Sequence, residues 1–573
     1  SGRSNQFGGS FGGPVSVPKL FSGRDRVFFF FSYSGIRQRL TETGSALYRT
    51  VPKTAWRQGD FSDLLAIDDR QYQIYDPRTA RLIDGRVVRN PFPGNRGIPI
   101  LNPMYDFYVN LYPPPNNVAG IVDTEGRNNY YALGMPKLND YDNLLNRFDA
   151  NMGQKQRLSG KWYWSGYLND QNDWTFRTMR GLQSSGTMQD SRGFTADYTW
   201  TPSGQSILSL NLSATRFSDG RQNNVLTKFK PSDVGLPKYM DDYAGDMHHL
   251  PRVNFSAIAS VGGDYPGINS HATTGQIKVG VVHVSSNHTW KFGWEERRYW
   301  RARQDNVTTS GQFTFGRDFV RRADDDTIAA NLGLEWAAFM MGVPTTTGIS
   351  GAEFKDSGYF STPWRGFYLQ DEMRLGRRSR LNLGARLEWE GGSTERYNRA
   401  LGGGFDFNLR LPFSDAVEAA YARNPIPNLS PSQFKAQGGG FYLGQNSPRT
   451  FTNAHLVLLP RVGFVLQVAP NTLLRTGIGW YADSLNVNDV SMNQLGYSIA
   501  TTTTVSNDNG LTLCCDADNQ PFAVAGLSST RSPLSNPFPI RADATRWERP
   551  YGNSLGGAIS AGKAVSFYDR DYN

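Results

Sequence analysis

Residues 380–390 have the sequence RLNLGARLEWE, in which apolar and polar side chains alternate without a break. Because successive side chains of a β-strand point to opposite faces, this alternation gives one apolar face and one wet face. The eleven residues match the roughly 9–11 residues of tilted strand that cross a lipid bilayer. The stretch therefore predicts a transmembrane β-strand, and much of the chain repeats its pattern.

The same alternation recurs in residues 157–168 and 288–300, where the tryptophans share one parity. An arginine on the lipid face near the bilayer midplane costs roughly 2–4 kcal/mol, so the charged parity must turn towards the lumen. The residues predicted to face lipid are Leu381, Leu383, Leu387, Trp389, Trp162, Trp164, Trp290 and Trp294. The residues predicted to face the lumen are Arg374, Arg386, Glu388, Lys291, Glu295 and Lys161. These charges could contact a solute or a plug, or they could form a ladder that only satisfies neighbouring strands.

The composition agrees with a barrel that has a polar lumen. Aromatic residues make up 13% of the 573-residue chain, while hydrophobic residues make up only 38%. In such a barrel every second residue faces lipid and aromatic girdles mark both interfaces. No run approaches the roughly 18 apolar residues of a transmembrane helix. The net charge of +9 is spread singly along strand-like segments, so we predict no nucleic-acid partner.

Four long segments lack the alternation and are rich in Pro and Gly. They cover residues of about 40–138, 218–264, 391–456 and 485–550. A compact soluble domain rarely contains irregular connections of such length. Barrels carry short turns on one side of the membrane and long loops on the other, so we expect these segments to be extracellular loops.

Two small clusters contain side chains of the kind that bind metals. His248 and His249 follow an acidic segment at 241–246, and residues 324–326 are three consecutive aspartates. Neither has a fixed ligand spacing, and the second lacks the alternating acidic positions of a calcium loop. We interpret both as solvated loops and predict no metal and no cofactor.

The remaining candidate chemistry is weak. Cys514 and Cys515 are the only cysteines, and their adjacency leaves open a vicinal disulfide or two free thiols. The GxSxG spacing occurs only within the Gly-rich segments GGSFG (8–12) and GNSLG (552–556), and no HExxH or paired-carboxylate signature is present. We therefore predict that the chain is not an enzyme.

Ten segments, in this order along the chain, resemble the barrel region of TonB-dependent outer-membrane receptors of the Oar-like, acidobacterial type. They are NQFGGSFGGP at 5–14, RDRVFFFFSYSGIRQR at 24–39, GDFSDL at 59–64, NPFPGNRGIP at 90–99, NRFDANMGQKQRLSGKWYWS at 146–165, HTWKFGWEERRY at 288–299, FYLQDEMRL at 367–375, LNLGARLEWE at 381–390, PRVGF at 460–464 and RTGIGWY at 475–481. Their order and spacing, rather than any single segment, carry the resemblance.

The resemblance implies an all-β fold, a large antiparallel transmembrane β-barrel with about 22 strands when complete. It also implies uptake of a scarce extracellular solute, driven by TonB with ExbB and ExbD acting through a plug. The plug and N-terminal domain of such receptors would precede Ser1, and barrel-closing strands would follow Asn573, so we expect residues 1–573 to be a barrel fragment located in outer-membrane lipid.

Two other functions fit parts of the pattern. A secreted, soluble β-rich protein could bind glycans through its aromatics, and a passive porin could use the same barrel without TonB. Strand length argues against the soluble protein. If the barrel assignment is right, Leu383→Arg should block assembly, whereas Arg386→Leu should be tolerated.

Overall fold

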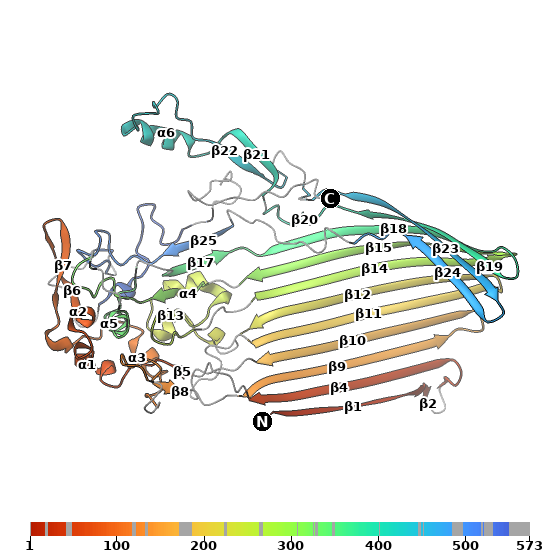
Figure 1. The fold of residues 1–573 in the computed structure, drawn as a ribbon, viewed down its shortest axis with the longest axis horizontal. Coiled ribbons are helices and arrows are strands. Elements are labelled where there is room, and N and C mark those ends of the chain that lie inside the picture. Colours follow the sequence, from red (N-terminus) through yellow and green to blue (C-terminus); the bar gives the residue numbers. More distant parts are fainter. Residues whose placement is uncertain are drawn as a thin grey trace.

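One long antiparallel sheet dominates the protein (Figure 1). The computed structural model describes residues 2–17, 21–41, 48–116, 122–131, 136–170, 186–222, 226–262, 268–305, 308–324, 326, 330–345, 350–399, 401–444, 449–450, 452–483, 497–516, 519–520, 531–548 and 550. The strands of this sheet, in spatial order, are β1 (Arg3–Pro14), β4 (Val27–Thr41), β9 (Pro136–Asn151), β10 (Gln156–Asp170), β11 (Gly186–Ser203), β12 (Ser206–Gln222), β14 (Ile268–Ser285), β15 (His288–Asp305), β18 (Gly358–Arg374), β19 (Ser379–Glu390), β23 (His455–Ala469) and β24 (Thr472–Gly479), with β20 (Thr394–Glu395) beside β18.

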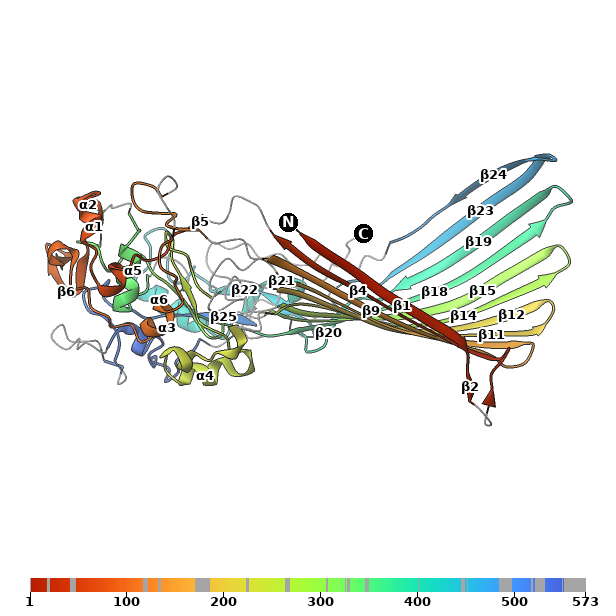
Figure 2. The same cartoon turned by 90° about the horizontal axis from the view of Figure 1, so that it is seen from below.

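Each strand of this path pairs antiparallel with its neighbour, which confirms the predicted all-β antiparallel architecture. Figure 2 shows that the sheet is strongly twisted and curved. Strands β1 and β24 form its two edges, and no described strand pairs with the outer side of either. None of the described helices is long and apolar enough to cross a membrane.

The strands are longer than the sequence pattern predicted. Residues 275–284 alternate clearly, yet β14 begins at Ile268 and has 18 residues. The added residues INSHATT (268–274) are mostly polar and do not alternate regularly, so their hydropathy carries no clear strand signal. The ladder to β12 holds them in the sheet as far as Asn269. The sheet therefore extends beyond its apolar part.

The connections differ sharply between the two ends of the sheet. At one end the hairpins turn tightly, as between β14 and β15, where only Ser286 and Asn287 intervene and Ser286 takes a left-handed φ of 54°. At the other end the chain makes long excursions, which gather on the left in Figure 1. This asymmetry is the one expected of outer-membrane barrels.

The long excursions contain many short elements. Their strands are β5 (Tyr48–Arg49), β6 (Tyr75–Ile83), β7 (Arg86–Pro91), β8 (Tyr130–Tyr131), β13 (Arg252–Asn254), β16 (Gln312–Thr314), β17 (Gly351–Lys355), β21 (Leu401–Arg410), β22 (Gln437–Tyr442) and β25 (Ser498–Thr502), while β2 (Ser16–Val17) and β3 (Phe21–Ser22) lie at the turn end. Their α-helices are α1 (Ser62–Leu65), α2 (Asp69–Tyr72), α3 (Tyr105–Val109), α4 (Tyr239–Ala244), α5 (Leu334–Met341) and α6 (Ser414–Arg423). Short 3-10 helices are η1 (Trp56–Gln58), η2 (Pro93–Asn95), η3 (Leu226–Lys228), η4 (Pro231–Val234), η5 (Gly245–Met247) and η6 (Pro533–Ser535).

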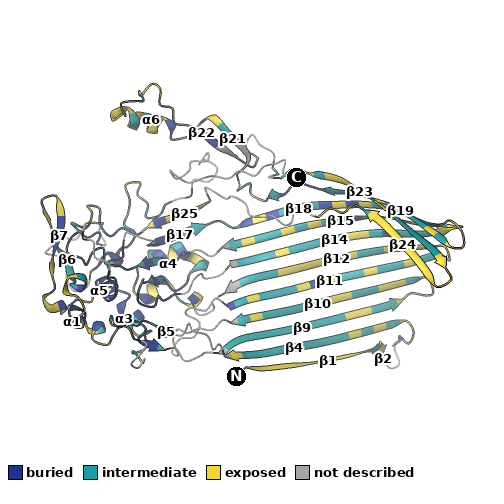
Figure 3. Ribbon diagram, viewed as in Figure 1, coloured by how far each residue is buried: buried dark blue, intermediate teal, exposed yellow. Residues whose placement is uncertain are grey.

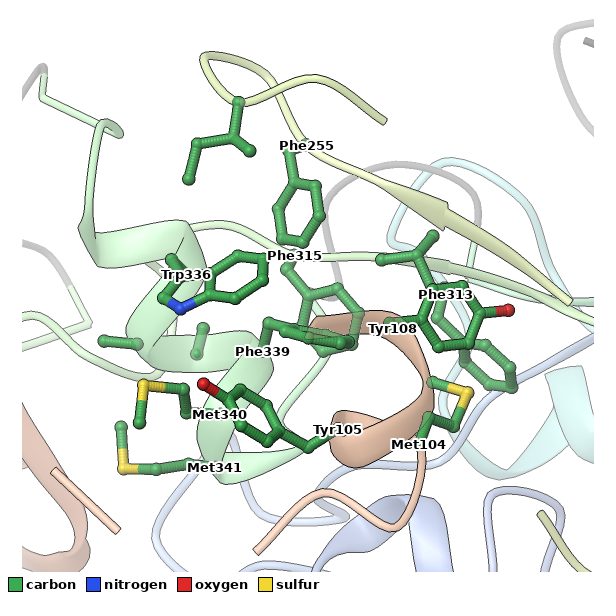
Figure 4. Packing of buried hydrophobic residues seen from close by; sticks show 14 of the residues in the cluster. Met104, Tyr105, Tyr108, Phe255, Phe313, Phe315, Trp336, Phe339, Met340 and Met341 are labelled. Atoms are coloured by element: carbon green, nitrogen blue, oxygen red, sulfur yellow. The ribbon is translucent and has the colours of Figure 1, made fainter. Parts of the chain in front are cut away.

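Much of these excursions folds around one shared hydrophobic core, and we call this part the head. Its core residues come from 51–130, 226–261, 313–352 and 505–538. Trp336 and Phe339 of α5 lie at the centre, with ring centroids 5.0 Å apart, and Tyr105 of α3 packs 5.8 Å from Phe339 (Figure 4). The burial colours of Figure 3 separate this dark core from the half-exposed sheet. Segments predicted to be irregular loops thus contribute to a packed structure.

Two segments of the head differ from what their sequence pattern indicates. The pattern of residues 334–341 fits a helix or a strand; in the structure they form α5, and all eight are buried, which removes the one-sided pattern that marks a surface helix. The pattern of residues 311–319 predicts a strand, but only Gln312–Thr314 pair, and they do so in the four-stranded sheet of the head rather than in the long sheet.

A buried carboxylate ties α5 to the neighbouring turn. The Glu335 side chain is fully buried and accepts hydrogen bonds from the backbone N–H groups of Ser256, Ala257 and Ile258, at 2.6–3.2 Å. The Ser256 hydroxyl donates to it as well. An unpaired buried carboxylate would be very unfavourable, so these donors make Glu335 a fixed link in the head.

The stability of the head should depend on pH through Glu335. Burial raises the pKa of this carboxyl group to about 7. Because the folded-state value lies above the unfolded value, the contribution to stability is full below about pH 4.3 and is lost as the pH rises through about 7. We expect the thermal midpoint at which residues 254–260 lose protection from hydrogen exchange to fall between about pH 5 and pH 8.

Glu335→Gln should remove most of this slope, because the amide does not titrate. Asp106→Asn, on the exposed side of α3, serves as the matched control and should keep the slope of the parent protein. An unchanged pH dependence in Glu335→Gln would refute the assignment of the slope to this residue.

Candidate functional site on the polar face of the sheet

The register of the sheet sorts the predicted residues onto two faces. Arg386 of β19 lies opposite Tyr368 of β18, which lies opposite Gly293 of β15. Two residues along, Glu388 lies opposite Gly366, which lies opposite Glu295. Following this parity across the sheet, Arg374, Arg386, Glu388, Lys291, Glu295 and Lys161 all belong to one face, which we call the polar face. The structure places them together as a set, although their exposure to a lumen stays a prediction.

Glu295 is the centre of an ionic cluster on the polar face. Its side chain is only 3% exposed and pairs with Arg386, 3.1 Å from Nη2 to Oε2, and with Arg297. Arg386 also donates from Nε to Glu388. The cluster contains two carboxylates and two guanidinium groups, so its charges balance. In a balanced, hydrogen-bonded cluster, the attraction between the charges offsets much of the desolvation penalty of a partly buried site.

Trp364 holds the two guanidinium groups in place. They lie over its ring at 4.8 Å for Arg297 and 5.2 Å for Arg386. Gly366 makes this packing possible, because a Cβ there would lie 2.7 Å from the Trp364 ring and 2.8 Å from Arg386. Three neighbouring strands, β15, β18 and β19, therefore meet in one stacked and ion-paired unit.

A hollow of about 670 Å³ lies beside this unit, over β18, β19, β23 and β24. Its polar lining includes Lys278, Tyr368, Gln370, Asn382, Arg386 and Arg461. Glycines, among them Gly384 and Gly463, leave its floor without side chains. Arg461 stacks on Tyr481 at 4.6 Å. The hollow offers many hydrogen-bond donors and three cations, which suits an anionic or hydroxyl-rich ligand.

A second hollow of about 900 Å³ lies at the turn end of β18, β19, β23 and β24 and is strongly basic. Its charged lining consists of Arg374, Arg377, Arg378, Arg380, Arg475 and Glu372. Arg380 pairs with Glu372 at 3.3 Å. The predicted residue Arg374 thus belongs to this turn-end group and lies apart from the Glu295 cluster.

The opposite face, which we call the apolar face, carries all eight residues predicted to meet lipid. Leu383 lies opposite Asp371, which lies opposite Trp290, and Leu387 is aligned with Phe367 and Trp294. Large side chains stand open on this face: Leu383 is 40% exposed and Trp162 is 41% exposed. A contiguous apolar surface of this size is unfavourable in water and needs a covering.

The described residues of the two clusters with metal-type side chains have other partners. The described residues contain no group of three or more His, Cys, Asp or Glu side chains arranged to hold a metal. His249 is buried against Leu250 and Ser310, and Asp326 pairs with Arg322 at 3.0 Å. Asp325 lies outside the described residues. Cys514 and Cys515 are buried and joined as a disulfide.

Sequence patterns missed three members of the cluster region. Trp364 follows Pro363, which is unusual inside a central strand and hides the alternation there. Arg297 lies in WEERRYW (294–300), where both parities carry charge. Arg461 follows Pro460 in the same way. The pairing of β15 with β18 assigns Trp364 and Arg297 to the polar face, and the pairing of β19 with β23 assigns Arg461 to it.

The comparisons with known proteins agree with a membrane sheet of this kind. A family model described as an outer membrane beta barrel domain matches residues 1–572. The search of curated proteins finds no match.

Solved structures with some similarity are outer-membrane proteins. They include the outer membrane transporter YddB from Escherichia coli (10% identity, 88% of this chain and 41% of that chain, TM-score 0.43) and the ferric-catecholate import receptor Fiu from E. coli K12 in its closed form (8% identity, 83% and 49%, TM-score 0.34). The FrpB iron transporter from Neisseria meningitidis is also similar (10% identity, 83% of this chain and 52% of that chain, TM-score 0.29). The chain thus spans about half or less of the length of these proteins.

The ionic cluster revises the expectation that Arg386→Leu is tolerated. Removing this guanidinium takes one of two cations from the buried Glu295, at a cost of roughly 3 kcal/mol when a buried charge loses its partner. We expect Leu383→Arg to block assembly and Arg386→Leu to weaken it, measured as heat-modifiable folded protein in outer-membrane fractions.

Asn382→Leu is the matched control on the polar face. It changes a polar residue of the same strand and makes no ion pair, so folded yield should stay near that of the parent. Equal yields for Leu383→Arg and Asn382→Leu would contradict the assignment of the two faces.

Proposed function

The chain belongs to the outer membrane beta barrel domain family, and from this premise we propose that it forms the wall of a TonB-dependent transporter that takes up a scarce solute. It is an outer-membrane protein of a Gram-negative type bacterium and not an enzyme. The observation that carries the proposal is the sorting of the predicted side chains onto one apolar and one polar face in strands β10, β15, β18 and β19.

The apolar face has the height needed to cross the membrane. Along β10 every residue of this parity from Leu158 to Leu168 is uncharged, although the positions of β11 opposite Trp164 and Gly166 are Arg192 and Asp190. Ten residues at about 3.3 Å each span about 33 Å, and a strand tilted by about 40° then rises about 25 Å. This equals the typical height of the apolar band in outer-membrane barrels. We assign this face, with Trp162 and Trp164, to outer-membrane lipid.

The polar face is then the inner wall of the barrel. The Glu295 cluster stiffens three strands, and the neighbouring hollow presents Lys278, Arg386 and Arg461 to the lumen. A scarce anionic or hydroxyl-rich solute would gain hydrogen bonds there without meeting lipid. Lumenal charge is therefore assigned to solute contact as well as to strand pairing.

The head stands at the end with the long connections, which is the extracellular side in barrels of this type. Its shared core, including Trp336 and Phe339, gives it a fixed shape before any ligand arrives. A preformed surface loses less conformational entropy when it captures a dilute solute. We assign solute capture to the head and passage to the polar face.

The driving force would come from TonB with ExbB and ExbD, acting through a plug. Barrels of about 22 strands have a lumen wide enough to need one. In a complete barrel the outer edges of β1 and β24 would pair with neighbouring strands, because an unpaired backbone edge is not tolerated in lipid. On this proposal residues 1–573 supply part of that barrel.

Uptake is tested by comparing the medium consumed by three strains: the parent, a deletion of this gene and a deletion of tonB. Mass spectrometry of nutrient-limited medium identifies every compound that the parent depletes. Both deletions should leave the same compound unconsumed, and restoring the gene should restore its depletion.

Two outcomes would overturn the proposal. A compound still depleted without TonB, but not without this gene, would indicate a passive porin. Identical media from the parent and the gene deletion would exclude uptake of any compound supplied.

A further inference from the structure

Three arginines stand where the apolar face ends towards the head. Arg192 of β11 and Arg216 of β12 lie directly opposite each other in the register. Arg298 of β15 lies two residues nearer the apolar band, across from Gly275 of β14. All three side chains are exposed. On the apolar parity they follow Phe194 and Ala214, so they mark a boundary between an apolar and a charged surface.

These arginines are only partly neutralised. Arg192 pairs with Asp190 at 2.7 Å and remains 64% exposed, while Arg298 donates from Nε to the Ser361 hydroxyl at 2.9 Å. No described carboxylate forms an ion pair with Arg216. Two like charges opposite each other on a sheet are destabilising. Arg192 and Arg216 therefore form a site that an anion would relieve.

A largely apolar groove of about 430 Å³ begins at Arg298, which is the one of the three arginines in its lining, and runs into the apolar band. Its lining also contains the Glu296 carboxylate, which pairs with Arg365 at 3.4 Å. Its apolar walls are Phe194, Leu212, Ile277 and Trp300. The groove is deepest where Ala214 and Gly275 lie side by side, because neither has a large side chain to fill it. Trp300 closes over Gly275, where an added Cβ would lie 3.2 Å from the indole ring. The groove is open along its length and joins an apolar channel to a cationic end.

We propose that this groove binds a phosphorylated lipid of the outer leaflet, with its phosphate at Arg192, Arg216 and Arg298 and one acyl chain along Phe194 and Ile277. The proposal rests on the membrane orientation assigned above, which puts the head end of the band at the headgroup level. Arginine is the residue best suited to bidentate phosphate contacts.

Charge complementarity selects this occupant over two others. A free phosphate ion would leave the apolar walls exposed, and these lie within the lipid-facing band. A second copy of the chain would bring the same patch against itself in a two-fold dimer, which opposes arginine to arginine. An anionic lipid would place its acyl chain on the apolar walls and its phosphate at the arginines, while Glu296 stays paired with Arg365.

Native mass spectrometry of the full chain, reconstituted in nanodiscs and released into detergent, tests the proposal with diphosphorylated lipid A as the probe. The parent should retain one lipid A more than the variant Arg216→Gln with Arg298→Gln. At about fivefold per arginine near a membrane surface, the affinity should fall about 25-fold. Ala214→Phe, which fills the groove and keeps every charge, should also reduce retention.

Arg374→Gln with Arg475→Gln is the charge-matched control on the polar face and should retain lipid A as the parent does. Phosphatidylcholine should not be retained by any form. Equal loss in the control, or equal retention in both arginine pairs, would overturn the site. Retained inorganic phosphate in place of lipid, or a dimer that forms only with the arginines intact, would assign the patch to the other occupants.

Heat-modifiable migration is measured on every variant. A variant that folds and loses lipid A supports the site, whereas folded variants that all keep lipid A refute it and leave the transport proposal untouched. Loss of TonB-dependent uptake in the gene deletion is independent of this result, so the two proposals fail separately.

Discussion

The backbone hydrogen-bond ladder from β1 to β24 is the constraint on which the rest of the structure depends. Lipid offers no hydrogen-bond partners, so a membrane sheet must satisfy every backbone group from its own neighbours. The ladder also fixes which side chains share a face. A slip of one residue between β18 and β19 would send Arg386 to the apolar face and Leu387 to the polar face. A sheet with the wrong register would therefore also be incompatible with the membrane.

The backbone ladder does not restrict which side chains occupy the polar face, and several of them form contacts between strands. Glu295, Arg386 and Trp364 come from three adjacent strands and can meet only if the register is correct. Their packing in turn opposes slippage, because each ion pair would be lost with a one-residue shift. The head follows a different principle. Its core joins residues from 51 to 538, so it depends on distant contacts and not on local alternation.

From the sequence alone, we could predict the features that follow from the alternation of apolar and polar residues, namely which side chains share a face. The face assignments around Leu383 and Glu388 needed only parity, and the structure keeps each predicted set together. The strand ends were missed because segments such as 268–274 are mostly polar and lack a regular alternation. The head was missed because Trp56, Tyr105 and Trp336 lie in separate segments without a period, and their burial arises only when those segments meet. Trp364 and Arg297 were missed because Pro363 and adjacent charges obscure the parity.

The central claim is that alternate residues of one strand meet different solvents. It is tested most directly by spin labels on β18 in reconstituted bilayers, at Phe367→Cys, Tyr368→Cys, Leu369→Cys and Gln370→Cys, with Cys514→Ser and Cys515→Ser as the background. The account predicts that labels at 367 and 369 relax with lipid-dissolved oxygen, and those at 368 and 370 with a water-soluble nickel chelate. Four labels with equal accessibility, or the opposite alternation, would contradict it.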